Sequence, residues 1–313
     1  LILLCLPMIG FGQNVNIPDA NFKAYLVGNS AINTNGDAEI QVSEAAAFSG
    51  VIACYNQNIS DLTGIEVFTA LTNLNCGGNQ LTYLDVSNNT ALDDLRCFSN
   101  LLTSLDVSQN TALTALNCEG NQFTSLDVSN NTALTILDCA SNQLTSLDVS
   151  NNTALDELIC MENQLTTLDI SNNIALSRLF CEFNQLTSLD ISNNIALIDL
   201  YCHMNQLTSL DVSQNTSLAE LGGSGNQLTS LDVRNGNNTN ILEFFTLFSP
   251  NLYCINVDDA AWSTTNWTNI DPQHYFSNNC PPPSAIQEHT TNKELLKVTD
   301  LLGRETKQTN QPL

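Results

Sequence analysis

The chain has 313 residues, of which 42% are apolar and only 13% are charged. Its charge is one-sided, with 32 acidic against 8 basic residues and a formal net charge of −24. Such a surface repels phosphate backbones and anionic headgroups, so the composition argues against nucleic acid and membrane surfaces as partners and favours calcium ions or basic partners.

Residues 1–12, LILLCLPMIGFG, form an apolar run in which Gly10 and Gly12 precede a plausible cleavage point before Gln13. This arrangement is typical of a secretory signal peptide, here truncated because its charged start is missing. The alternative is a short buried strand. No later stretch is long and apolar enough to span a bilayer. We therefore expect a mature chain without a transmembrane segment, secreted or located at the outer cell surface.

Residues 13–50 predict a small helical N-terminal cap. Phe22, Tyr25 and Leu26 fall on one helical face of the segment 17–30 and can cover the end of the fold that follows. A second helical segment, SEAAAFSG, occupies 43–50.

Between the two helical segments, residues 33–44 read NTNGDAEIQVSE and place oxygen-bearing side chains at positions 1, 3, 5, 7 and 12. These residues are Asn33, Asn35, Asp37, Glu39 and Glu44. The spacing is similar to the calcium loop of EF-hands and dockerins, in which a late Glu closes the site. Asn replaces the usual first Asp and Ala38 replaces a turn glycine, so we expect calcium to be a possible, weakly bound cofactor that is not required. The alternative is an Asn/Asp-rich turn that leads into a helix cap.

A period of 21 residues dominates the chain from 51 to 258. Two columns follow it: Cys76, Cys97, Cys118, Cys139, Cys160, Cys181 and Cys202, and Asn79, Asn100, Asn121, Asn142, Asn163, Asn184, Asn205 and Asn226. One unit, 113–133, reads LTALNCEGNQFTSLDVSNNTA. Its first half fits L-x-x-L-x-C-x-x-N-x-[LF], which resembles the leucine-rich-repeat consensus with Cys in place of one Leu.

Alternation within L-x-C points Leu and Cys inward, and strands one coil apart can stack in parallel at about 4.8 Å. A single coil cannot bury its Leu, Cys and Val side chains, whereas stacked neighbours can. We therefore predict a leucine-rich-repeat solenoid of 21-residue coils. It should have a parallel β-sheet on the concave face, short extended segments opposite and the helical N-terminal cap.

The cysteine column favours packing over chemistry. Thiols stacked in register on parallel strands have poor geometry for disulfides, and free Cys behaves as a small hydrophobe. Cys254 and Cys280 stand outside the register, and in a secreted protein they are predicted to form a disulfide at the C-terminal end.

The first half of the repeat varies at its outward positions, where successive coils place Asn75, Arg96, Asn117, Asp138, Ile159, Phe180 and Tyr201 between Leu and Cys. The later coils predict an apolar ligand-binding patch on the concave face, rimmed by acidic residues that include Glu182. Its members are Ile159, Met161, Phe180, Phe183, Tyr201, His203 and Met204. The alternative is a cross-strand ladder that only stabilises the sheet.

The second half of the repeat is nearly constant, with LDVSNN or a close variant in every coil. It predicts an exposed column of Asp85, Asp106, Asp127, Asp148, Asp169, Asp190, Asp211 and Asp232. Like charges at this spacing repel, so the column is either a solvated ridge or a surface that binds cations.

Residues 259–280 contain both tryptophans, Trp262 and Trp267, and predict a hydrophobic C-terminal cap. A stiff polar linker, PPPSAIQEHTTNK, follows at 281–293. Residues 294–313 contain Asp300-x-x-Gly303-Arg304. This segment resembles the start of the C-terminal sorting domain of the type IX secretion route of Bacteroidota. The resemblance implies export through that secretion machinery, with only part of the domain in this chain.

No enzymatic function is expected. The histidines, His203, His274 and His289, lack the paired spacing of a metal site, and neither a G-x-S-x-G elbow nor a Walker loop occurs. The repeats resemble bacterial surface proteins of internalin-like architecture. This predicts a secreted or cell-surface module that binds a protein or glycan through the variable concave face. The alternative is a calcium-stabilised structural scaffold without a specific ligand.

Overall fold

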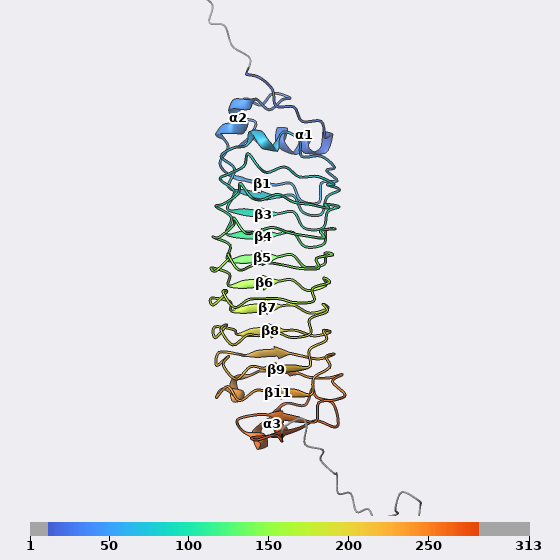
Figure 1. Ribbon diagram of the computed structural model, residues 1–313. Coiled ribbons are helices and arrows are strands. Elements are labelled where there is room, and N and C mark those ends of the chain that lie inside the picture. The colour runs from blue at the N-terminus through green and yellow to red at the C-terminus, as the bar shows by residue number, and fades with distance from the viewer. Residues whose placement is uncertain (1–11, 282–313) are drawn as a thin grey trace, which may run out of the picture. The chain divides into compact units, whose positions relative to one another are not determined.

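The structure is a computed structural model that describes residues 12–281, and these residues form a stack of coils (Figure 1). The signal peptide predicted for 1–12, the linker for 281–293 and the sorting segment for 294–313 lie outside the described residues, except for Gly12 and Pro281 at their borders.

Ten three-residue strands form a parallel sheet along one side of the stack, in chain order. They are β1 (Val51–Ala53), β2 (Asn73–Asn75), β3 (Asp94–Arg96), β4 (Ala115–Asn117), β5 (Ile136–Asp138), β6 (Glu157–Ile159), β7 (Arg178–Phe180), β8 (Asp199–Tyr201), β10 (Glu220–Gly222) and β12 (Glu243–Phe245). Residues 21 apart lie opposite each other, as Leu116, Leu137 and Leu158 do. The predicted leucine-rich-repeat solenoid is therefore confirmed.

The second half of each coil runs along another side of the stack. Its last four copies pair as a parallel sheet of β9 (Ser209–Asp211), β11 (Ser230–Asp232), β13 (Cys254–Asn256) and β14 (Tyr275–Ser277). In the described coils before β9, the equivalent L-D-V segments are assigned no strand pairing. Two short 3-10 turns, Ile65–Val67 and Asn238–Asn240, lie at the loops of the first and a late coil.

Two helices cover the first coil, α1 (Ala20–Val27) and α2 (Val42–Ala47). Asp19 caps α1, because its Oδ1 accepts hydrogen bonds from the backbone N–H groups of Asn21 and Phe22. Phe22 and Leu26 are buried, and the hydroxyl oxygen of Tyr25 accepts a hydrogen bond from the N–H of Ala53 in β1 at 2.9 Å. The helical cap thus provides a hydrogen-bond acceptor for a backbone N–H group of the edge strand β1.

The other end of the stack is covered by α3 (Ala260–Asn266) and by β14, which pairs with β13. The ring of Trp267 stacks on Phe244 of β12, with centroids 4.2 Å apart. Cys254 and Cys280, the pair that the sequence singles out, are joined by a disulfide with their Cα atoms 5.8 Å apart.

The cysteines of the repeat line the core. Among residues 12–281 eight cysteines are free, Cys54 and the seven of the column, and all of them are buried. Burial raises the pKa of their thiols, for Cys97 to about 12, so they stay protonated and act as apolar side chains.

Two columns of buried asparagines tie each coil to the one before. In the first column, Asn142 donates through Nδ2 to the carbonyls of Cys118 and Cys139, and its Oδ1 accepts from the N–H of Phe123. In the second column, Nδ2 of Asn152 donates to the carbonyls of Val128 and Asn131 at 3.0 and 2.9 Å. These amides satisfy backbone groups that the core separates from water.

We expect Asn152→Ala to lower the free energy of unfolding by roughly 2 kcal/mol, because it removes two buried hydrogen bonds to carbonyls that then keep only a backbone N–H donor. The matched control is Asn151→Ala: Asn151 is exposed and makes one long contact, 3.3 Å, to the carbonyl of Ser129. This control should cost under about 0.5 kcal/mol. Urea denaturation measures both, and equal losses would contradict a special role for the buried column.

Candidate functional site

The outward side chains of the ten-stranded sheet form three columns, one from the first strand position, one from the third and one from the second residue after the strand. Side chains in a column lie on adjacent paired strands, as Ile159, Phe180 and Tyr201 do on β6, β7 and β8. Because every coil repeats the same geometry, coils differ on this face only in side-chain chemistry. We refer to this surface as the sheet face.

The third-position column changes from polar to aromatic along the chain. In β2 to β4 it contains Asn75, Arg96 and Asn117, and from β7 onward it contains Phe180, Tyr201, Gly222 and Phe245. Phe180 and Tyr201 stack with centroids 5.5 Å apart and an interplanar angle of 10°. His203 lies 5.6 Å from Tyr201 and 6.3 Å from Phe245. We call Phe180, Tyr201, His203 and Phe245 the aromatic row; all four are half-buried.

Gly222 makes room for this row. It occupies the third position of β10, directly opposite Tyr201. A Cβ atom there would come within 2.1 Å of Nε2 of His203 and 2.7 Å of Cδ1 of Tyr201. The two rings therefore lie over the glycine, and any other residue at this position would displace them.

The first-position column beside the aromatic row is acidic. It contains Glu157, Asp199, Glu220 and Glu243, with Arg178 as its one cation. Arg178 contacts Glu157 and Asp199 at 3.5 Å each. Burial and the neighbouring Glu220 raise the pKa of Asp199.

The hydroxyl of Tyr201 reaches across to this acidic column. It lies 2.6 Å from Oε2 of Glu220 and 3.1 Å from Oε2 of Glu243. Burial and the two carboxylates raise the pKa of Tyr201, so its phenol stays protonated. His203 accepts a hydrogen bond at Nδ1 from the N–H of Ser224, and burial lowers its pKa, which keeps the ring neutral at pH 7.

The predicted ligand residues fall into two groups. Ile159, Met161, Phe180, Tyr201 and His203 are half-buried side chains of the sheet face. Phe183 and Met204 are exposed by 54% and 46% at the turn that follows the strand, where their φ angles are +53° and +51°. The structure therefore brings the five together, and places the other two at the rim.

Two acidic residues expected at the surface are buried. Asp138 was expected to point out of the core, but only 8% of it is exposed. Its carboxylate accepts hydrogen bonds from Nδ2 of Asn117 and the N–H of Ala140. Glu182 was expected on the rim, yet it is 9% exposed and its Oε2 has no hydrogen-bond partner. The positions alternate as predicted, but neighbouring side chains cover both carboxyl groups.

Sequence reasoning missed three members of the site, Phe245, Glu243 and Gly222. The step from β10 to β12 spans 23 residues, so a search at a spacing of 21 does not align Phe245 with Tyr201. It also missed Ile174 and Ile195, which are exposed by 63% and 60%. A signal for these two existed, because both replace the Thr of the repeated N-N-T.

Four of the five predicted calcium ligands lie in the loop before α2 and Glu44 lies in the first turn of α2, and their oxygens already accept hydrogen bonds from the chain. Oδ1 of Asn33, Asn35 and Asp37 accept from the N–H groups of Gly36, Asp37 and Glu39 respectively. Glu39 pairs with Lys23 at 2.6 Å. Glu44 accepts from Thr34, Asn35 and Gln41 and completes a capping box for α2. These contacts are those of the turn-and-cap alternative, and calcium binding stays a prediction.

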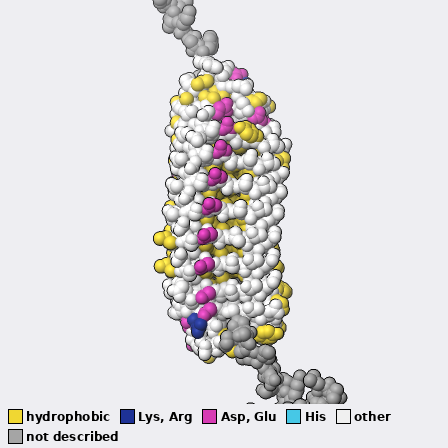
Figure 2. All heavy atoms as spheres, viewed as in Figure 1, with side chains coloured by type: hydrophobic (Ala, Val, Ile, Leu, Met, Phe, Trp, Pro, Cys, Tyr) yellow, Lys and Arg dark blue, Asp and Glu magenta, His cyan; other side chains and the backbone are white. Residues whose placement is uncertain are grey.

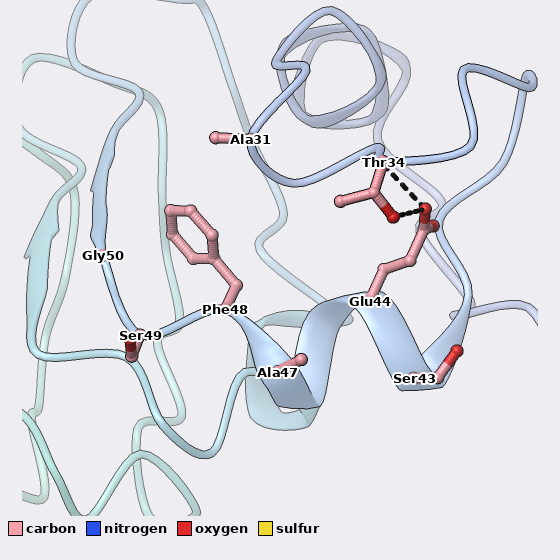
Figure 3. Close-up of a pocket in the computed structure, with 8 residues that line it drawn as sticks. All are labelled: Ala31, Thr34, Ser43, Glu44, Ala47, Phe48, Ser49 and Gly50. Atoms are coloured by element: carbon pink, nitrogen blue, oxygen red, sulfur yellow. Dashed lines mark hydrogen bonds between the residues drawn. The ribbon is translucent and has the colours of Figure 1, made fainter.

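A pocket of about 410 Å³ opens beside this loop, between it and α2. Figure 3 shows Thr34 and Glu44 hydrogen-bonded on one side and the ring of Phe48 on the other. Glu44 is its only titratable side chain, and both of its carboxylate oxygens have donors. The polar lining that remains consists of the hydroxyl groups of Ser43 and Ser49, so the pocket offers a ligand no free charged group.

The aspartates of the constant half-repeat are exposed except for the half-buried Asp232, and Figure 2 shows a column of acidic side chains along the face it displays. Oδ1 of each accepts from the N–H two residues later, as Asp127 does from Ser129 at 2.9 Å. The hydroxyl and N–H of Ser129 lower the pKa of Asp127. Serines lower the pKa in the same way at Asp85, Asp106, Asp148, Asp169 and Asp190.

Asp138 generates a pH-dependent prediction. Burial raises its pKa from 3.8 to about 6. The folded state therefore binds this proton more tightly than the unfolded state, and the resulting stability is full below about pH 4 and lost as the pH rises through 6. We expect the free energy of unfolding to fall by roughly 2 kcal/mol over this pH range, and we expect Asp138→Asn to abolish that fall. Urea denaturation between pH 4 and 7.5 measures it, and curves of equal slope for both proteins would refute it. Asp127→Asn, at an exposed aspartate of lowered pKa, should not flatten the profile.

Comparisons with known proteins agree with this architecture. No protein-family model matches the chain. The functional domain of InlJ from Listeria monocytogenes, described as including a cysteine ladder, is 33% identical with a TM-score of 0.59. The match covers 85% of this chain and 70% of that one. A leucine-rich-repeat protein of Leptospira interrogans shares the fold at 23% identity and a TM-score of 0.55, over 70% of this chain and 63% of that one.

The curated protein Internalin J of Listeria monocytogenes is 44% identical over 73 residues. The match covers 23% of this chain and only 8% of the length of that relative. Together with the stacked coils and the cysteine column, the similarity to the InlJ domain shows that the chain belongs to the leucine-rich-repeat proteins of internalin-like architecture.

Proposed function

We propose that the chain is a secreted or cell-surface binding module that recognises a protein or glycan ligand through its sheet face. The observation that carries the proposal is the aromatic row, which forms a contiguous half-exposed apolar surface on a strongly acidic solenoid. Contiguous apolar surface of this kind usually marks a binding site, and solenoids generally use the surface of the stacked sheet for binding.

The repeats supply an internal comparison. The coils of β2 to β4 form the same sheet with Asn75, Arg96 and Asn117 at the third position. The fold therefore does not require aromatic residues there. Phe183 and Met204 lie at turns rather than in the sheet, so their exposure adds nothing to a cross-strand ladder. A role in binding accounts for both groups.

The remaining features are compatible with a binding role. The part of the chain that the structure describes contains no group of three or more His, Cys, Asp or Glu side chains arranged to hold a metal ion. Within residues 12–281, none of the helices has the length and hydropathy needed to cross a bilayer. Export by the predicted signal peptide and type IX sorting segment belongs to the same proposal.

We expect Phe180→Ser combined with Tyr201→Ser to weaken binding to any ligand found by glycan array or pull-down by at least about tenfold, since aromatic anchors dominate such interfaces. The melting temperature should fall by only a few degrees, since a stacked pair contributes about 1 kcal/mol. The matched control is Asn75→Ser, at the same position of β2. Intact binding with a large loss of stability would support the ladder alternative.

The second candidate function is a structural scaffold stabilised by calcium. It is favoured by the exposed aspartate column, which carries like charges in register over many coils. This candidate predicts that the melting temperature rises in millimolar calcium relative to EGTA. Equal melting temperatures in the two buffers would remove calcium from both the aspartate column and the loop 33–44.

A further inference from the structure

The cations of the described residues are all used within the chain. Lys23, Arg96, Arg178 and Arg234 each form an ion pair with a carboxylate of the protein. The surface of residues 12–281 therefore presents an excess of negative charge and no unpaired Lys or Arg side chain. A partner that binds by charge complementarity must bring positive charge.

On the sheet face, acidic side chains lie beside aromatic rings at β8, β10 and β12. Asp199, Glu220 and Glu243 occupy the first position of these strands, and Tyr201 and Phe245 lie two residues further along β8 and β12. Arg178 approaches Asp199, but among residues 12–281 no Lys or Arg side chain pairs with Glu220 or Glu243.

Tyr201 cannot satisfy both of the carboxylates, Glu220 and Glu243, that its hydroxyl approaches. The phenol of Tyr201 carries a single proton, so it can donate to Glu220 or to Glu243 but not to both at once. One of the two carboxylates always lacks this donor. A guanidinium or ammonium group between them supplies several donors and the missing charge.

Glu182 adds one more carboxyl group to this part of the sheet face, below the surface. It lies one coil before His203, in the same outward column. Its Oε2 is buried without a hydrogen-bond partner, and burial raises the pKa of the carboxyl. Burial favours the neutral form of Glu182, so the positive charge of a partner is attracted to Glu220 and Glu243, which reach the surface.

We infer that the sheet face at β7, β8, β10 and β12 binds a basic segment of a partner protein, with an Arg or Lys side chain lying against Tyr201 and Phe245 between the carboxylates of Glu220 and Glu243. This inference rests on the proposed function and names the chemistry of its ligand. Cations are attracted to the faces of aromatic rings and to carboxylates together. A neutral glycan could stack on the rings but would leave these carboxylates without a counter-charge.

The experiment selects peptides from a phage-displayed library of random linear dodecapeptides on the full chain. Enriched peptides are then measured for affinity against three variants. Glu220→Gln with Glu243→Gln removes two charges next to the aromatic row. Asp127→Asn with Asp148→Asn removes two charges from the exposed aspartate column and is the matched control. Phe180→Ser with Tyr201→Ser reports whether the peptide binds the sheet face at all.

We expect enriched peptides to share an Arg or Lys, and replacing it by Gln should weaken binding at least about tenfold. The Glu220/Glu243 variant should lose a similar factor and the aspartate control less than about twofold. Peptides that need Phe180 and Tyr201 but bind equally to the Glu220/Glu243 variant, or that lack a shared basic residue, would overturn the inference and leave the proposed function standing. Peptides unaffected by the aromatic substitutions would overturn both.

Discussion

The structure depends on one constraint: each coil must return the chain to the same position, so that buried polar groups of the backbone meet the same donors in every coil. The asparagines of the two buried columns meet this constraint, because each amide bridges its own coil and the preceding one. Leu and Cys side chains then stack in the interior as a continuous core that no coil could form alone. The register is thus fixed by hydrogen bonds and stabilised by apolar burial.

A fixed register turns each outward position into a column, and a column concentrates whatever chemistry its residues have. On the constant side this produces a row of aspartates, whose charge is stabilised locally by serine donors. On the sheet face the same geometry assembles aromatic rings from separate coils into one surface. Gly222 is an exception that contributes by its lack of a side chain, since the rings of Tyr201 and His203 occupy the space above it.

The electrostatics of the sheet face follow from the same stacking. Carboxylates at the first strand position lie on neighbouring strands, so burial and the adjacent Glu220 together raise the pKa of Asp199. Within the first-position column, Arg178 alone supplies positive charge to these carboxylates. The face therefore combines apolar contact area with uncompensated negative charge, a combination suited to a basic protein surface.

The sequence alone determined the solenoid, its parallel sheet and the inward cysteines, because a strict period of 21 leaves a stack as the way to bury every coil. It also identified Phe180 and Tyr201 as neighbours. Only the tertiary structure showed that Asp138 and Glu182 are buried, since their burial depends on how the side chains of adjacent coils pack around them. It likewise brought Phe245 and Glu243 beside Tyr201, because two extra residues before β12 break the period without breaking the stack. Periodicity predicts where the backbone returns, whereas the surface that a ligand meets is decided by packing between coils.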